Sequence, residues 1–243
     1  MRIDKFLSVA KTVTRKEAGI AARAGKILVN GVVAKNADCH IDPEIDEIIY
    51  CGEVIEYRKF IYILMNKPLG VVSATDDKSE KTVLDLLDDN LRQYNLFPCG
   101  RLDKYTTGLV LLTNDGELSH KLLSPKHHVT KSYSFFCTND LTDKDIEKLQ
   151  KGVHIEGGYL TKPCHMDVNE TKTSGVITLT EGKYHQIKQM FGAVGNEITT
   201  LKRITFGPLN LNDLPNEGTY RPLTDLEIES LKDFADRCEK SLK

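Results

Sequence analysis

Residues 99–118 read CGRLDKYTTGLVLLTNDGEL and contain the clearest strand signal of the chain. The apolar run at residues 108–113 predicts a buried β-strand, and the Asn-Asp-Gly sequence at 114–116 predicts the turn that ends it. Asp103 falls in the loop before this strand, two residues after Arg101. A carboxylate held there can act as a nucleophile or a base, or it can accept hydrogen bonds from the amides of its own turn. These residues alone leave both roles open.

Outward from this strand, the larger part of the chain shows strands that follow one another directly or return through single helices. We expect strands at residues 60–65, 71–73, 132–138 and 175–180, a bend at 66–70, a short helix capped by Thr82 within 76–90, and helices at 142–151, 185–194 and 224–240. No regular alternation of strand and helix is present. The pattern therefore predicts an α+β fold with a mixed, mostly antiparallel sheet flanked by helices.

The first 35 residues contain a pattern of two helices and a hairpin. Apolar spacing predicts a first helix over residues 4–11. Thr14 and Glu17 form a capping box that opens a second helix, and Gly25 closes it. The Asn-Gly pair within residues 26–34 is typical of a tight two-residue turn between two strands. Together these signals predict a small αα-hairpin followed by a β-hairpin.

Charge is unevenly distributed along the chain. The whole sequence has 33 Lys and Arg against 35 Asp and Glu, a formal net charge of −2. Residues 1–40 carry eight basic and three acidic side chains, a net charge of +5, whereas residues 41–60 carry six acidic and two basic ones. The near-neutral total is thus a sum of opposed segments, and it does not exclude a basic surface for nucleic acid.

Neither metal binding nor export is indicated. The six cysteines lie at least a dozen residues apart without a C-x-x-C pair, so we expect reduced thiols and no metal site. The N-terminus lacks the apolar core of a secretory signal, and no apolar run approaches the roughly 18 to 20 residues of a membrane span. We expect a cytoplasmic protein with no membrane partner.

Two parts of the chain resemble known modules. RIDKFLSVA and TRKEAGIAARAGKILVNGVV, in the first 33 residues, resemble the S4 RNA-binding module. GRLDKYTTGLVLLTNDG, Lys131-Ser132-Tyr133 and EGKYHQIKQM at 181–190 are similar, in this order, to three motifs of pseudouridine synthases. The chain is thereby identified as resembling the S4-bearing ribosomal RNA pseudouridine synthases (the RsuA family). The resemblance implies an S4-like RNA-binding domain at residues 1–59 and a catalytic domain at residues 60–243.

The resemblance also implies a reaction and roles for single residues. The family isomerises uridine to pseudouridine without cofactor, metal or redox change. Asp103 is then the essential carboxylate, Tyr133 lies against the extruded base, and Lys188 pairs with Asp103, where the broad family pattern has Arg. Leu201 packs under the tyrosine. From the residues alone, Tyr133 and Leu201 can equally be core side chains.

Further residues are expected to contact RNA. Arg101 is a candidate to fill the space left by the extruded base or to hold a phosphate. The other expected contacts near the motifs are Lys131, Lys183, His185, Gln186 and Arg203. The expected phosphate contacts of the S4-like segment are Arg2, Lys5, Arg15, Lys16, Arg23 and Lys26. The alternative for this second group is that they are only solvated positions on helix faces.

We expect site-specific pseudouridine formation in 16S ribosomal RNA, at the single 16S site of the family (uridine 516 type). The expected partner is 16S RNA, free or within a partly assembled small subunit, and the expected state is a monomer. Two alternatives stay open. One is a 23S ribosomal RNA pseudouridine synthase, and the other is a non-catalytic RNA-binding factor in ribosome assembly.

Overall fold

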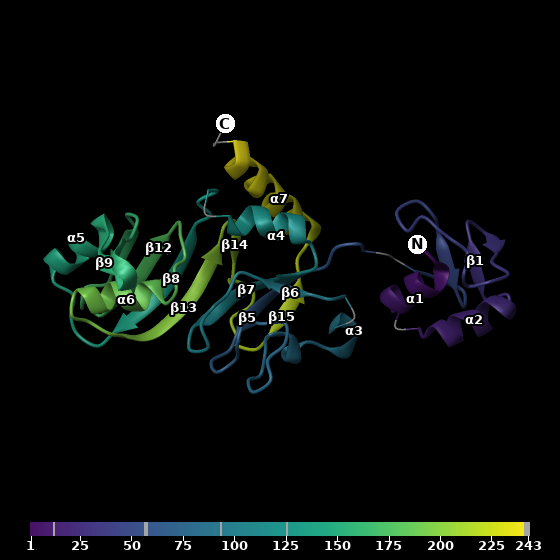
Figure 1. Ribbon diagram of the computed structural model, residues 1–243, viewed down its shortest axis with the longest axis horizontal. Helices are drawn as coiled ribbons and strands as arrows, with labels where there is room; N and C mark the ends of the chain where they lie inside the picture. The colour runs from purple at the N-terminus through teal and green to yellow at the C-terminus, as the bar shows by residue number, and fades with distance from the viewer. Residues whose placement is uncertain (12, 56–57, 93, 125, 241–243) are drawn as a thin grey trace. The chain divides into compact units, whose positions relative to one another are not determined.

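The computed structural model describes residues 1–243 except 12, 56–57, 93, 125 and 241–243, and it divides the chain into two compact units (Figure 1). The first comprises Met1–Ile61 and Leu87–Leu96, and the second comprises Tyr62–Leu86 and Phe97–Lys243. Glu56, one of the six acids counted at 41–60, lies outside the described residues. Among the residues described, no helix is both long enough and apolar enough to cross a membrane.

Among its described residues, the first unit contains three helices and a small antiparallel sheet of strand order β2-β1-β3-β4. Its elements are α1 (Ile3–Lys11), α2 (Arg15–Arg23), β1 (Ile27–Val29), β2 (Val32–Val33), β3 (Ile48–Tyr50), β4 (Glu53–Val54) and α3 (Asp89–Arg92). Thr14 and Glu17 form the expected capping box of α2. Asn30 and Gly31 both have positive φ angles, 51° and 76°, as a type I′ hairpin turn requires. The expected helices and hairpin are confirmed.

The core of this unit lies between helices α1 and α2 and the sheet. Phe6 and Leu7 of α1, Ala18 of α2, Ile27 of β1 and Ile48 of β3 are buried together. The acidic segment contributes β3 and β4 to this sheet, which the sequence did not predict because strands of three and two residues are too short to show a period. Removal of these apolar side chains from water stabilises the small unit.

The second unit is built on one nine-stranded sheet. Its central order is β11-β12-β8-β13-β7-β5-β15, with β14 paired to β13 and β6 to β7. The strands are β5 (Tyr62–Lys67), β6 (Phe97–Cys99), β7 (Thr107–Thr113), β8 (Lys131–Cys137), β11 (His165–Val168), β12 (Ser174–Leu179), β13 (Ile198–Phe206), β14 (Leu209–Asn210) and β15 (Tyr220–Pro222). Only the β13–β7 pair of this sheet, as described, is parallel. The expected α+β class with a mixed, mostly antiparallel sheet is confirmed.

Four helices, two 3-10 turns and a short hairpin complete this unit. They are η1 (Leu84–Leu86), α4 (Gly116–Leu123), α5 (Asp143–Lys151), β9 (His154–Ile155), η2 (Glu156–Gly158), β10 (Tyr159–Leu160), α6 (Gln186–Ala193) and α7 (Asp225–Lys240). Helices α4 and α7 pack beside each other (Figure 1). Thr142 caps α5 with the help of Asp145, as expected.

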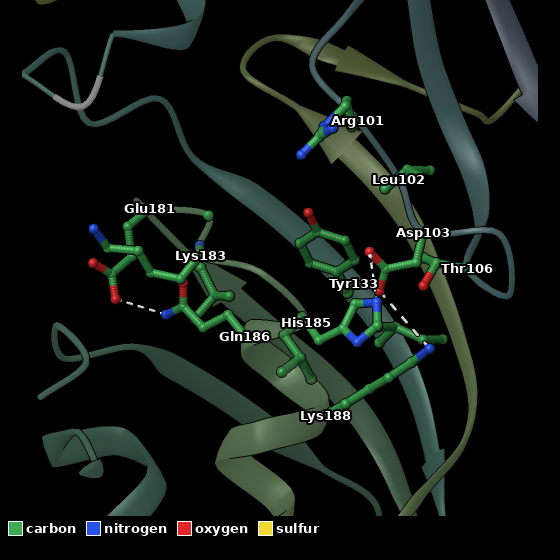
Figure 2. A pocket seen from close by; sticks show the side chains of 14 residues that line it. Arg101, Leu102, Asp103, Thr106, Tyr133, Glu181, Lys183, His185, Gln186 and Lys188 are labelled. Atoms are coloured by element: carbon green, nitrogen blue, oxygen red, sulfur yellow. Dashed lines mark hydrogen bonds and ion pairs between the residues drawn. The ribbon is translucent and has the colours of Figure 1, made fainter. Parts of the chain in front are cut away.

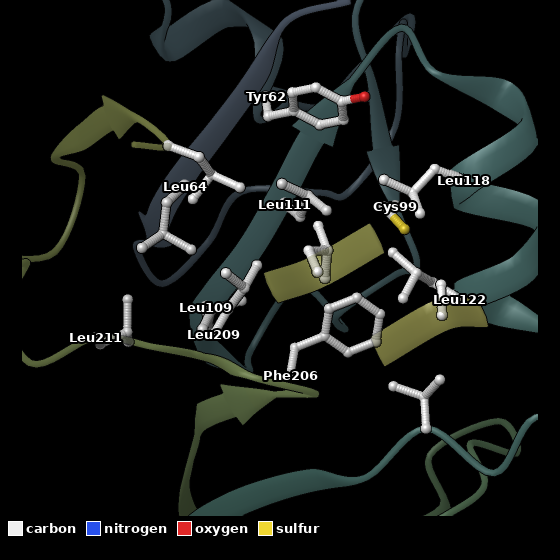
Figure 3. Packing of buried hydrophobic residues seen from close by; sticks show 14 of the residues in the cluster. Tyr62, Leu64, Cys99, Leu109, Leu111, Leu118, Leu122, Phe206, Leu209 and Leu211 are labelled. Atoms are coloured by element: carbon white, nitrogen blue, oxygen red, sulfur yellow. The ribbon is translucent and has the colours of Figure 1, made fainter. Parts of the chain in front are cut away.

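Two hydrophobic cores share this sheet. The first core joins β5, β7 and β13 to α4 and α7, with Leu64, Leu109 and Phe206 among its buried members (Figure 3). The second joins β8, β12 and β13 to α5 and α6, with Phe135 and Phe191 in edge-to-face contact. Strand β13 belongs to both, so it connects the two parts of the sheet.

Three predicted elements differ from the structure. The strand expected at 60–65 is β5 and continues through Lys67, into the expected bend. Residues 71–73 form no strand; Val72 makes an isolated bridge to Thr82 instead. The helix expected within 76–90 is reduced to the 3-10 turn η1, whose first turn uses Thr82 as the acceptor for the amide of Asp85. Four apolar residues were too few to sustain a helix there.

Candidate active site

The loop that carries Asp103 is fixed by hydrogen bonds to buried groups. The Nζ atom of Lys67 donates to the carbonyl oxygen of Thr106 at 2.9 Å. The hydroxyl of Ser73 both donates to the carbonyl of Leu102 and accepts from its amide, each at 3.1 Å. The amide of Thr106 donates to the carbonyl of Asp103, which closes the turn. The backbone of the loop is therefore held in place before any ligand binds.

The carboxylate of Asp103 points toward two side chains from the start of α6 (Figure 2). Its Oδ2 atom lies 3.8 Å from Nζ of Lys188, and its Oδ1 atom lies 3.5 Å from Nε2 of His185. The Asp103 side chain is 29% exposed, so the carboxylate is accessible to a ligand. The structure thus brings Lys188 beside Asp103, and it adds His185, for which the sequence suggested only an RNA contact.

The backbone of His185 explains how its ring reaches the carboxylate. His185 precedes α6 and has left-handed angles, φ 47° and ψ 30°, which are uncommon for a residue with a side chain. Lys188, in the first turn of the helix, extends to the same carboxylate (Figure 2). The beginning of α6 therefore supplies both groups that contact Asp103.

Lys67 is a second ammonium group near this site. It is fully buried on β5, and its Nζ atom also donates to the carbonyl of Pro68 at 3.0 Å. Burial lowers the pKa of Lys67 to about 8, while the negative charge of Asp103 acts to raise it. The sequence analysis placed Lys67 in the bend at 66–70 and did not name it as a site residue. The available signal was a single lysine close to the end of the apolar run at 60–65.

Tyr133 and Leu201 lie in the same hollow as Asp103. Tyr133 comes from β8 and Leu201 from the neighbouring strand β13. Together with Arg101 and Lys188 they line a space of about 90 Å³, and Leu201 is almost wholly buried in its wall. Figure 2 shows the Tyr133 ring next to Asp103 and His185. The structure thus gathers the expected site residues from strands, a loop and a helix that are far apart in the sequence.

Gln186 holds the motif loop and is not an exposed contact. It is buried, its Nε2 atom donates to Glu181 at 2.6 Å, and its Oε1 atom accepts from the amide of Lys183 at 2.8 Å. Glu181 also accepts from the hydroxyl of Tyr159 and the amide of Lys162. Burial acts to raise the pKa of Glu181, but these hydrogen bonds outweigh it and lower the pKa. Gln186 therefore supports the loop from within the wall of the hollow that contains Asp103, and its contact with RNA stays a prediction.

A larger hollow of about 430 Å³ adjoins the first and shares Arg101, Asp103, Tyr133 and His185 with it. Most of the charged side chains in its lining are cationic. Five Arg and Lys side chains face two carboxylates, Asp103 and Glu181, and the cations are Arg101, Lys131, Lys162, Lys183 and Arg203. The excess of positive charge makes this hollow suited to an anionic ligand.

Two of these cations are much less exposed than the sequence suggested. Arg203 is only 2% exposed, and its Nε atom donates to the carbonyl of Leu109 at 2.7 Å. The Nζ atom of Lys131 donates to the carbonyl of Val129, and burial, with the nearby charge of Arg203, lowers the pKa of Lys131 to about 8. Their charges therefore act from the wall of the hollow and not from an open rim.

In the first unit, the side chains expected to contact phosphates lie on the surface. All six are exposed, namely Arg2, Lys5, Arg15, Lys16, Arg23 and Lys26. Arg2 differs, because its guanidinium forms two hydrogen bonds to the carboxylate of Asp4, at 2.7 and 3.1 Å. Neutralised in this way, Arg2 is a weaker candidate for a phosphate contact than the other five.

Comparison with known proteins agrees with this geometry. Residues 61–193 match the sequence profile described as RNA pseudouridylate synthase. The chain is 46% identical over 237 residues to the uncharacterized RNA pseudouridine synthase YtzG of Bacillus subtilis (strain 168), covering 96% of this chain and 99% of that protein. It is 39% identical over 232 residues to ribosomal small subunit pseudouridine synthase A of Escherichia coli (strain K12), covering 95% and 100%. A crystal structure of a pseudouridylate synthase aligns at 36% identity with a TM-score of 0.66, covering 95% and 99%.

Proposed function

Because this chain belongs to the RNA pseudouridine synthase family, we propose that it isomerises one uridine of 16S ribosomal RNA and uses Asp103 as the essential carboxylate. The family assignment makes the protein an isomerase that modifies RNA. The choice of small-subunit RNA is supported by the relative from Escherichia coli, which aligns over its whole length. A site of the uridine 516 type is part of this proposal.

The placement of Asp103 carries the proposal. The reaction breaks the bond between N1 of the base and C1′ of the ribose, turns the base and joins its C5 atom to C1′. N1 gains a proton and C5 loses one, so no oxidant or reductant is needed. A carboxylate can add to the sugar or remove one of its protons, and both routes require the ionised form. The ammonium of Lys188 lies 3.8 Å from this carboxylate, and the buried ammonium of Lys67 is close enough to be influenced by its charge.

The side chains beside Asp103 can bind a nucleobase that has been extruded from an RNA helix. Extrusion of a nucleotide costs a few kcal/mol, and stacking on an aromatic ring offsets part of it. Tyr133 offers such a ring beside the carboxylate, with Leu201 in the wall of the same hollow. Its hydroxyl can also exchange a proton with the base when C5 is released. Arg101 lines both hollows, and we assign it to a backbone phosphate of the RNA.

We assign RNA binding outside the site to the N-terminal domain at residues 1–59. Five of its exposed cations, Lys5, Arg15, Lys16, Arg23 and Lys26, provide contacts to phosphates, which give affinity but little sequence information. The choice of uridine then depends on the hollow around Asp103. This division of tasks explains how a chain with a net charge of −2 can bind a polyanion.

The catalytic role is tested by Asp103→Asn. We expect no tritium release from uridine-labelled ribosomal RNA, with binding to that RNA retained, because the phosphate contacts lie elsewhere. Asp140→Asn, at an exposed carboxylate outside both hollows, is the matched control and should keep full activity. Unchanged turnover by Asp103→Asn would leave the non-catalytic assembly factor as the better interpretation.

The RNA target is tested separately. Pseudouridine is mapped in both ribosomal RNAs of the source organism with and without the gene. Loss of one pseudouridine in 16S RNA is the expected result, whereas loss in 23S RNA favours the large-subunit alternative. Restoration by the wild-type gene, but not by the Asp103→Asn gene, assigns the lost site to this active centre.

A further inference from the structure

We propose that Tyr184, stacked on His185, is a platform for an unpaired nucleobase next to the reacting uridine. This inference rests on the proposed function, because it assumes an RNA substrate at Asp103. It adds a second base-binding position to the site, outside the hollow that takes the uridine itself.

The first support is the exposure of an ordered aromatic ring beside the site. Tyr184 is 69% exposed, and its ring lies 3.9 Å from that of His185 with 17° between the two planes. The Nε2 atom of His185 lies 3.5 Å from Oδ1 of Asp103. Tyr184 thus contacts His185, and His185 contacts Asp103, so the three residues form a row of successive contacts. A base stacked on Tyr184 would extend this row by one more ring.

The second support is that the loop is fixed although its tyrosine is exposed. The carbonyl oxygen of Tyr184 accepts a hydrogen bond from Nε2 of Gln189 at 2.8 Å, and Gln189 in turn accepts from the amide of Glu156. One residue earlier, the amide of Lys183 donates to the buried Gln186. An aromatic ring held in this way loses little further freedom when a ligand stacks on it, which favours binding.

The third support is the charge around the ring. Tyr184 lines the larger hollow together with Arg101, Lys162 and Lys183. The carboxylate of Glu181, also in this lining, already accepts three hydrogen bonds from the protein. An aromatic face beside a cationic groove is the combination that single-stranded nucleic acid requires, because the bases stack while the phosphates are neutralised.

The test compares Tyr184→Ala with Tyr184→Phe in the full-length protein. Stacking on one aromatic side chain affects substrate binding, so we expect Tyr184→Ala to raise KM at least about fivefold with little change in kcat. Tyr184→Phe keeps the ring and should behave like wild type. Phe136→Ala removes a comparably exposed ring, 56% accessible, outside both hollows, and is the matched control.

A direct readout uses RNA with 2-aminopurine at the position next to the target uridine. In the Asp103→Asn background, binding should quench its fluorescence, and the additional change to Tyr184→Ala should remove that quenching. Wild-type KM for Tyr184→Ala, or quenching that persists without the ring, would overturn the platform. An equal loss in Tyr184→Phe would also overturn it, since the hydroxyl would then be the active group.

Failure of the platform and failure of the proposed function are distinguishable. If Asp103→Asn retains turnover, the proposed function is wrong whatever Tyr184 does. If Asp103→Asn is inactive while Tyr184→Ala matches wild type in KM and quenching, only the platform is wrong. Far-ultraviolet circular dichroism of each variant checks that the fold is intact.

Discussion

Gly108 and Arg203 face each other where β7 and β13 pair in parallel, and their backbones are in close contact. A Cβ atom at position 108 would lie 2.2 Å from the carbonyl oxygen of Arg203. Gly108 also has a φ angle of 104°, which side chains rarely adopt. This contact joins the two parts of the sheet. Gly108 follows Asp103 by five residues and Arg203 follows Leu201 by two, so the contact holds both site residues in position.

Gly108→Ala should therefore destabilise the protein and reduce its activity. The added methyl group meets backbone atoms that cannot turn aside, and we expect a loss of at least about 2 kcal/mol in the free energy of unfolding. Urea denaturation measures this change. Gly116→Ala is the control, since a Cβ at position 116 meets nothing within 4 Å. Equal stability of the two variants would show that the strands can separate at little cost.

Lys188→Met should lower kcat, because it removes a charge that stabilises the Asp103 carboxylate. The ion pair is partly exposed, so we expect a loss of about 10- to 100-fold, less than for a fully buried oxyanion donor. Lys188→Arg keeps the charge and should retain much more activity than Lys188→Met. Lys148→Met, on the exposed face of α5, controls for loss of a lysine as such. Initial rates of tritium release give kcat and KM, and a wild-type kcat for Lys188→Met would contradict this role.

Lys67 should make stability depend on pH above neutrality. Its folded pKa of about 8 lies below the ordinary value of 10.5, so the folded state releases a proton that the unfolded state still binds. The free energy of unfolding of wild type, relative to Lys67→Met, should therefore rise as the pH increases from about 8 to about 10.5. Urea denaturation of both proteins at several pH values measures this difference in the free energy of unfolding. The contributions of the other titrating groups are common to both proteins and cancel. A flat or falling difference would mean that burial does not disfavour the charged ammonium.

The exposed cations of the first unit should control the salt dependence of RNA binding. Replacing Arg15, Lys16 and Arg23 together with alanine removes three possible phosphate contacts, each of which adds about 0.7 to the slope of log K against log salt for single-stranded RNA. We expect weaker binding and a slope reduced by about 2. Three lysines of α5, Lys144, Lys148 and Lys151, provide a control triple. An unchanged slope in the first triple would remove these cations from the binding surface.

The fold could be predicted where the signals are local. The capping box at Thr14 and the Asn-Gly turn at Asn30 are complete within a few residues, and both elements have the expected form. Helix α4 was missed, because Asp115 looked like a turn residue while it caps this helix and accepts a hydrogen bond from the hydroxyl of Tyr62. Strand β13 was also missed, although the Gly207-Pro208 turn connects it to β14, because its pairings with β7 and β8 join residues that lie far apart in the sequence.

The site shows the same limit. The family resemblance pointed to Asp103, Tyr133 and Lys188, which the residues alone left open, and these three residues line one hollow. The contact from His185 depends on a left-handed residue before α6, and the buried position of Lys67 depends on its pairing with Gly108. Both arise from tertiary structure, so no pattern within a short stretch of sequence could reveal them.

The position of β13 in the sheet also determines when the site can form. This strand joins the two cores and contributes Leu201, yet it occupies residues 198–206 of 243. During synthesis the Asp103 loop leaves the ribosome about a hundred residues earlier, at a time when its parallel partner does not exist. Strand pairings this far apart in sequence also form slowly. We therefore expect a nascent chain to fold its first unit, which ends at Leu96, well before the site around Asp103 is complete.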